Sequence, residues 1–130
     1  MEWSMKELYL MRHGKTQENI EHILMGQIDS PLCDEARVEI LSIKPYVVKP
    51  DQIISSDLKR ASETARMLFP GMELTQLPQL RERHFGVLQG YSYQALEKKG
   101  LKVLKTLNFI LQKLSEAQLR EILTLVNGLR

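Results

Sequence analysis

Short apolar runs alternate along this chain with segments of helical period, and this alternation limits the folds that the chain can adopt. Residues 8–11 (LYLM) and 51–57 (DQIISSD) contain continuous apolar runs, which are typical of short strands buried on both faces. Residues 72–80 (MELTQLPQL) indicate a weaker third strand, which Pro78 interrupts.

Two helices are predicted between these runs. The first covers residues 34–43, with Asp34 as its N-cap and Pro45 beyond its end. The second covers residues 58–69. Four of its apolar residues share one helical face: Leu58, Ala61, Ala65 and Leu68. The order strand, helix, strand, helix, strand predicts an α/β fold with a parallel sheet and crossover helices.

Polar residues directly follow the first two apolar runs. Arg12, His13 and Gly14 come after residues 8–11, and SSD, residues 55–57, closes the second run. The carboxyl ends of parallel strands are where such sheets bind ligands. An arginine fork matches two phosphate oxygens, and a neutral imidazole can attack phosphorus. These residues therefore indicate a phosphate site, although a capped strand end is the simpler interpretation of the tripeptide alone.

Arg60 stands on the first turn of the second predicted helix, and its position has two interpretations. It can be a second phosphate clamp beside Arg12, helped by the positive end of the helix. It can instead be a solvated arginine on a helix capped by Asp57 or Ser56. The local pattern leaves both open.

A third polar cluster lies in LRERHFGVLQG, residues 80–90. It places Glu82 among Arg81, Arg83 and His84. A carboxyl group near a bound phosphoester can protonate the leaving oxygen. The alternative is a surface salt-bridge cluster, which is the usual fate of mixed charges.

The last part of the chain differs in character from the rest. Residues 96–130 carry 7 Lys and Arg against 3 Asp and Glu, net +4, whereas residues 1–95 carry 11 against 13, net −2. Two apolar stripes of helical period within residues 101–129 predict a helical hairpin with apolar faces that need a partner. We therefore expect a first domain over residues 1–98 and a C-terminal hairpin over residues 99–130, packed on that domain or on a partner.

Composition excludes several classes of protein. The formal net charge of +2 is too small to favour nucleic-acid or membrane binding. Cys33 is the single cysteine and has no disulfide partner in the chain, which favours a reducing compartment. The apolar run near the start is too short for a signal peptide or a membrane span. We expect a cytoplasmic protein.

Four stretches in this order resemble the histidine phosphatase superfamily, the phosphoglycerate mutase-like phosphatases and mutases. They are LMRHGKTQEN, GQIDSPL, SSDLKRASETA and LRERHFGVLQG, and together they span residues 7–95. The resemblance implies the three-layer parallel-sheet fold of that family, here truncated and followed by the helical hairpin.

The same resemblance implies roles for individual residues. His13 would be the phosphorylated nucleophile, and Glu82 would be the acid that protonates the leaving group and then activates water. Four further residues match binding positions, namely Arg12 and Arg60 for the phosphoryl group, Asn19 for substrate or phosphate, and Arg83 for substrate. No metal and no cofactor is implied, because arginines and the nucleophile do this work.

The chain departs from the family pattern in its histidines. The family uses a second histidine after a later strand, and this sequence has histidines only at positions 13, 22 and 84, with His22 interpreted as a solvated loop residue. Two functions are therefore expected. One is a phosphatase of small phosphorylated metabolites, with weak or no activity. The alternative is a non-catalytic phosphate-binding or interaction protein that forms a homo-oligomer through residues 101–129.

Overall fold

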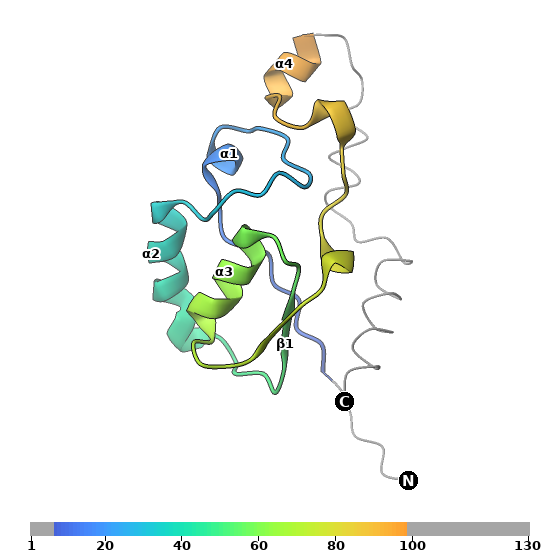
Figure 1. Cartoon of the computed structure of the whole chain (residues 1–130). Helices are drawn as coiled ribbons and strands as arrows, with labels where there is room; N and C mark the ends of the chain where they lie inside the picture. The colour runs from blue at the N-terminus through green and yellow to red at the C-terminus, as the bar shows by residue number, and fades with distance from the viewer. Residues whose placement is uncertain (1–6, 99–130) are drawn as a thin grey trace.

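The computed structural model describes residues 7–98, which form short helices and strands joined by long loops (Figure 1). The helices and strands are α1 (Gln17–Ile20), α2 (Asp34–Ile43), β1 (Ile53–Ser55), α3 (Lys59–Leu68), β2 (Leu74–Gln76) and α4 (Tyr93–Lys98). Three short 3₁₀ helices complete the set, η1 (Lys44–Tyr46), η2 (Pro78–Leu80) and η3 (Gly86–Leu88). The predicted hairpin over residues 101–129 lies outside the described residues.

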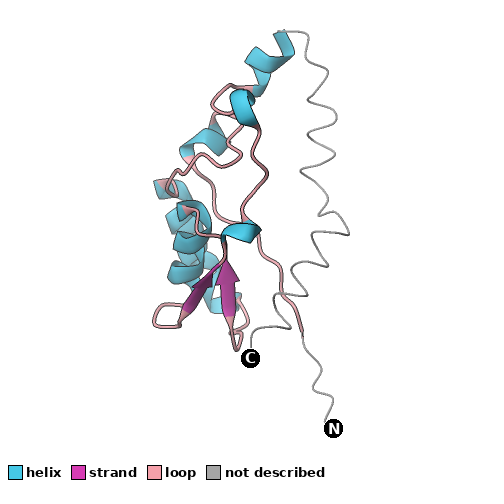
Figure 2. Ribbon diagram, turned by 45° about the vertical axis from the view of Figure 1, so that its right-hand side comes forward, coloured by secondary structure: helices cyan, strands magenta, loops and turns pink. Residues whose placement is uncertain are grey.

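The two strands form a parallel pair with α3 as the crossover between them. Ile53 pairs with Leu74, and Ser55 pairs with Gln76. Beyond the paired residues, the backbone N–H of Leu77 donates to the carbonyl oxygen of Ser55 over 2.9 Å. Figure 2 shows the strands adjacent to each other with the helices beside them. The predicted α/β fold with a parallel sheet is confirmed.

The prediction of a buried strand over residues 8–11 is wrong for the described structure. These residues form no strand, and their side chains are 40% to 60% exposed. A strand needs backbone partners on a neighbouring strand, and burial on both faces needs covering layers. Within residues 7–98 the sheet consists of β1 and β2 alone, so this apolar segment has neither.

Both predicted helices are present, and one cap differs. α2 has the predicted bounds, but Asp34 is its first residue and Cys33 is the N-cap, without a side-chain hydrogen bond. The Asp34 carboxylate instead lies in the first turn, where it interacts favourably with the helix dipole. α3 is one residue shorter at each end than predicted. None of the helices in residues 7–98 is long and apolar enough to cross a membrane.

The main apolar core lies between α2 and α3, which pack against each other (Figure 1). It contains Leu32, Ala36, Ile40 and Leu68, all buried. A second, smaller cluster joins Leu24 to Leu96 of α4. The buried side of α3 is largely polar, so the predicted apolar face is only partly correct: Leu58 and Leu68 are buried, and the two alanines are half-buried.

We predict that Leu68→Ala lowers the free energy of unfolding by about 2–5 kcal/mol, because it leaves a cavity in the main core. Leu68 is 5% exposed, whereas Leu41 on α2 is 56% exposed, so Leu41→Ala is a matched control that we expect to change stability by about 0.5 kcal/mol or less. Urea unfolding followed by circular dichroism measures both. Equal effects of the two substitutions would contradict this core.

Candidate active site

Residues 11–15 line a cleft with a volume of about 390 Å³. Its polar lining includes all the candidate residues that precede α1, and further residues from other elements. The polar side chains on its wall are Arg12, His13, Lys15, Asn19, His22, Glu39, Thr64 and Tyr93. Four of these are cationic or can become so, which makes the cleft suited to an anionic ligand.

The imidazole of His13 is held by the backbone next to it. Nδ1 of His13 lies 2.6 Å from the carbonyl oxygen of Gly14. A carbonyl oxygen only accepts, so Nδ1 must carry the proton in this contact. Nε2 of the neutral ring then keeps its lone pair, as a nucleophile requires.

The surroundings of His13 favour the neutral ring. Burial lowers the pKa of His13 most, and the positive charges of Arg60 and Arg12 lower it further. The hydrogen bond to Gly14 and the Glu82 carboxylate act in the opposite direction, and the net pKa lies below the ordinary value of 6.5. Near neutral pH the ring is therefore uncharged and able to attack an electrophile.

The loop that carries His13 is anchored to α2 and α3 at Gly14. Its backbone N–H donates to Oγ1 of Thr64 over 2.9 Å, and that hydroxyl donates to the carbonyl of Arg60 over 2.7 Å. A Cβ at Gly14 would lie 2.9 Å from Cδ1 of Ile40 and 3.0 Å from Cδ2 of Leu32. The close approach of this loop to the core therefore requires glycine.

Asn19 is oriented by the start of α1. The backbone N–H of Thr16 donates to Oδ1 of Asn19 over 2.9 Å, and the N–H of Asn19 donates to Oγ1 of Thr16 over 3.2 Å. This reciprocal capping box assigns the amide oxygen to the backbone. Nδ2 of Asn19 donates to Sδ of Met25 over 3.8 Å, which leaves its second hydrogen for the cleft that Asn19 lines.

Arg60 is buried, with 4% of its surface exposed, so the interpretation of it as a solvated arginine is wrong. Its Nη1 donates to the carbonyl of Ile28 over 2.8 Å, and its Nη2 donates to the carbonyl of Gly26 over 2.7 Å. Burial lowers the pKa of Arg60, and the carboxylates around it, Glu82 first among them, partly restore it. An arginine keeps its charge in proteins, and here that charge acts on His13.

The predicted caps of α3 are also wrong. Leu58 is its N-cap and makes no side-chain hydrogen bond, while Oδ1 of Asp29 accepts the backbone N–H of Lys59 over 2.7 Å. Asp57 instead forms a two-point ion pair with Arg81, whose Nε lies 2.6 Å from Oδ1. The sequence pattern missed both contacts because each partner lies more than 20 residues away along the chain.

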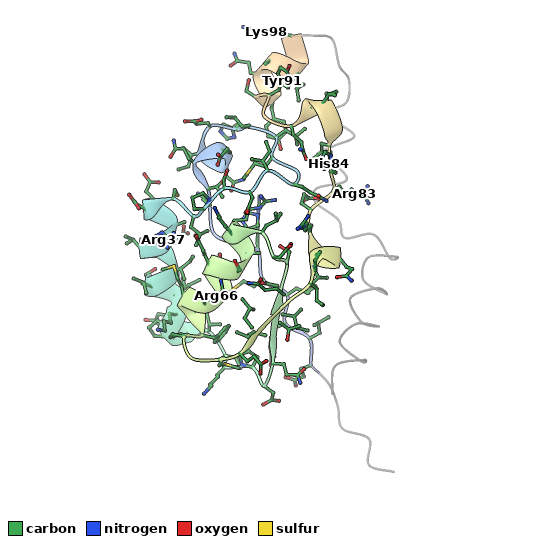
Figure 3. The ribbon with its side chains drawn as sticks, viewed as in Figure 1. Arg37, Arg66, Arg83, His84, Tyr91 and Lys98 are labelled. Carbon is green, nitrogen blue, oxygen red and sulfur yellow. The ribbon has the colours of Figure 1, made fainter. Side chains whose placement is uncertain are left out.

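Glu82 and Arg83 are exposed and lie outside the cleft lining. Oε1 of Glu82 accepts the backbone N–H of Arg83 over 2.8 Å. Figure 3 shows the Arg83 side chain projecting away from the body of the described structure. The Glu82 carboxylate influences the pKa of His13, whereas the structure does not bring Arg83 to the cleft.

Sequence reasoning did not assign five of the polar cleft residues to the site: Lys15, His22, Glu39, Thr64 and Tyr93. Lys15 and His22 come from the polar loop, and Tyr93 comes from α4, some 80 residues after His13. His22 is exposed, as expected, but it has a left-handed backbone with φ of 54°, and its carbonyl accepts the N–H of Tyr93 over 2.9 Å. A positive φ on a non-glycine residue is the signal of local strain that points to such a site, and only the structure reveals it. Burial raises the pKa of Tyr93, and the Glu82 charge adds to this increase.

Metal ligands do not gather anywhere in the described part of the chain. Among residues 7–98, no group of three or more His, Cys, Asp or Glu side chains is placed to hold a metal ion. Arg12 and Lys15 place positive charge on the cleft wall.

Comparison with known proteins identifies phosphatases and phosphoglycerate mutase-like proteins as relatives of this chain. The sequence profile of the histidine phosphatase superfamily (branch 1) matches residues 8–118. A metal-independent phosphoserine phosphatase of Arabidopsis thaliana is 37% identical over 106 residues, which cover 76% of this chain and 44% of that protein. A probable phosphoglycerate mutase GpmB of Enterobacter sp. (strain 638) is 38% identical over 65% of this chain and 41% of that protein.

Solved structures of phosphatases are also similar to this chain. A mycobacterial glucosyl-3-phosphoglycerate phosphatase in complex with VO3 superposes with a TM-score of 0.67 and 28% identity, over 72% of this chain and 49% of that one. The chain thus spans less than half the length of the two curated relatives. The matched profile runs past residue 98, and the division into domains at that residue stays a prediction.

We predict that the pKa of His13, followed by an NMR titration of its imidazole resonances, lies below 6.5 in the folded chain and returns toward 6.5 in urea. Because the unfolded chain then binds the proton more tightly, the free energy of unfolding should fall as the pH drops from about 6.5 toward the folded pKa. His13→Gln assigns the resonance and should remove this part of the pH dependence. A folded pKa above 6.5 would contradict the described environment.

Proposed function

The chain belongs to the histidine phosphatase superfamily (branch 1), and we propose that it hydrolyses small phosphoric monoesters through a phosphohistidine on His13. The observation that carries this proposal is the contact between Nδ1 of His13 and the carbonyl of Gly14, which leaves Nε2 free. A pKa below the ordinary value keeps that nitrogen unprotonated. The four-motif resemblance seen in the sequence agrees with the family match.

In the proposed first step, Nε2 of His13 forms a bond to phosphorus while the bond from phosphorus to the ester oxygen breaks. Glu82 gives its proton to the leaving oxygen, so that an alcohol departs. In the second step, the Glu82 carboxylate takes a proton from water as that water attacks the phosphohistidine. Phosphate leaves, and His13 returns to its neutral form.

Two arginines and an amide would bind the phosphoryl group. Arg12 and Asn19 line the cleft with His13, and Nδ2 of Asn19 is available as a donor. Arg60 is buried outside the cleft lining and uses two of its five N–H groups on backbone carbonyls. Its charge acts on His13, and its remaining N–H groups would have to reach the cleft to bind the phosphoryl group directly. Positive charge fixed in advance around the phosphoryl oxygens is the main source of rate in such transfers.

The substrate class that we propose is a small phosphorylated metabolite that carries a second anionic group. The relatives named above act on phosphoserine or on phosphoglycerate derivatives. Lys15 and His22 lie on the cleft wall and offer charge or hydrogen bonds to such a group. Arg83 is assigned to substrate binding by the family resemblance alone, and it would have to swing toward the cleft to act there.

Activity of this chain is expected to be weaker than that of a two-histidine member of the family. The sequence has no histidine after His84. Loss of one fixed donor to a transferring group lowers rates by about 10²–10³. Among the described residues, the Lys15 ammonium and the His22 imidazole lie on the cleft wall and could compensate in part.

We predict that His13→Ala lowers kcat/KM for p-nitrophenyl phosphate by at least about 10³, because the covalent route is lost. His84→Asn is the matched control. Nδ1 of the exposed His84 accepts the N–H of Gly86 over 2.9 Å, and an asparagine oxygen can replace it. Equal rates of the wild-type chain and His13→Ala would refute the assignment of His13.

A second function is motivated by apolar surface that needs a partner, both the exposed segment over residues 8–11 and the two predicted apolar stripes within residues 101–129. Leu8, Tyr9, Leu10 and Met11 are 40%, 60%, 56% and 53% exposed, which is unusual for a continuous apolar run. In this alternative the chain binds phosphate without turnover and forms a homo-oligomer through residues 101–129.

If this alternative holds, sedimentation velocity should give a dimer for the full chain. Leu111→Glu, which places a charge on a predicted apolar stripe of the hairpin, should dissociate that dimer, while Gln112→Glu on the polar side should not. A monomer at all concentrations would contradict the alternative.

A further inference from the structure

Gln89 lies seven residues after Glu82 and joins two segments that are distant along the chain. Its Oε1 accepts the backbone N–H of Gln27 over 2.9 Å and that of Phe85 over 3.3 Å. The side chain is half-buried. One amide oxygen thereby ties the loop before α2 to the segment that carries Glu82.

The loop at Gly26 is shaped to receive this amide. Gly26 has a φ of +55°, and a Cβ there would lie 2.3 Å from Oε1 of Gln89 and 2.9 Å from the carbonyl of Arg83. A side chain at this position would therefore push the Glu82 segment away. Both the positive φ and the close approach require glycine.

A second contact reaches the backbone of Glu82 itself. Nε2 of Gln27 donates to the carbonyl of Glu82 over 3.1 Å. On the other side of the same loop, the guanidinium of Arg60 holds the carbonyls of Gly26 and Ile28. Hydrogen bonds made by residues 26–28 thus link Arg60, whose charge acts on His13, to the backbone of Glu82.

We propose that Gln89 is a positioning residue that holds Glu82 where its carboxyl group can protonate the leaving oxygen. The Arg81–Asp57 pair anchors the segment before Glu82, and Gln89 anchors it afterwards. Glu82 itself is exposed, so its placement depends on these two anchors and on the Gln27 contact to its carbonyl, and not on packing of its side chain. This inference rests on the proposed function.

The proposal has a signature that a purely structural role lacks. Proton donation matters most when the leaving alcohol is a poor leaving group, and little when it is a good one. Misplacing Glu82 should therefore slow an alkyl phosphate much more than an aryl phosphate. A general loss of folded protein would slow both equally.

The test measures kcat/KM of Gln89→Ala in the full chain with β-glycerophosphate and with p-nitrophenyl phosphate. We expect a loss of about 10- to 100-fold for the alkyl ester and of about threefold or less for the aryl ester. Gln89→Glu keeps an oxygen that can accept both N–H groups and should recover most of the alkyl activity. Gln94→Ala, an exposed position on α4, is the matched control and should change neither rate.

Equal losses on both esters, or no rescue by Gln89→Glu, would overturn the positioning role. If the wild-type chain hydrolyses neither ester, the proposed function fails by itself, and amide hydrogen exchange decides the inference. The N–H of Arg83 reports on Glu82, because it donates to Oε1 of that residue. Faster exchange of this amide in Gln89→Ala supports the positioning role, and unchanged exchange overturns it.

Discussion

Hydrogen bonds from the buried polar side of α3 join the loops that make the candidate site. Arg60 and Thr64 lie one helical turn apart and are 4% and 6% exposed. The guanidinium holds the carbonyls of Gly26 and Ile28, and the Thr64 hydroxyl accepts the N–H of Gly14. A buried guanidinium without partners would cost several kcal/mol, so the loop at 26–28 is held in place wherever α3 is folded.

This arrangement explains how an irregular region can present ordered chemistry. The described part of the chain has two three-residue strands, and most candidate residues lie on loops. The loop of His13 is nevertheless fixed at the backbone of Gly14, by Thr64 on one side and by the apolar core on the other. His13 takes its orientation from the Gly14 carbonyl, so its reactive nitrogen depends on backbone geometry and not on a side-chain partner. The loop at residues 26–28, which Arg60 holds in place, is connected in turn to the segment that carries Glu82.

Sequence patterns predicted the local elements well and the distant contacts poorly. The bounds of α2 and the positions of both strands follow from periodicity and from Pro45, which act within a few residues. The apolar run at 8–11 has the composition of a strand, yet strand formation depends on a neighbour that composition does not specify. Arg60 had two acceptable interpretations because its hydrogen-bond partners lie more than 30 residues away. The burial of Arg60 excludes the interpretation of it as a solvated side chain.

The sequence by itself determined the family and the identity of the chemical groups, because four ordered motifs specify side chains of defined type at defined spacing. It also determined the bounds of α2, and those of α3 to within one residue, since periodicity and helix breakers act locally, but it did not identify their caps. Tertiary structure alone decided that Lys15, His22 and Tyr93 share the cleft of His13, and that Arg83 does not. It alone decided that Gln89 reaches the loop at Gly26. The physical reason is that such contacts depend on which distant segments the folded chain brings together, and the residue pattern within one segment does not specify that.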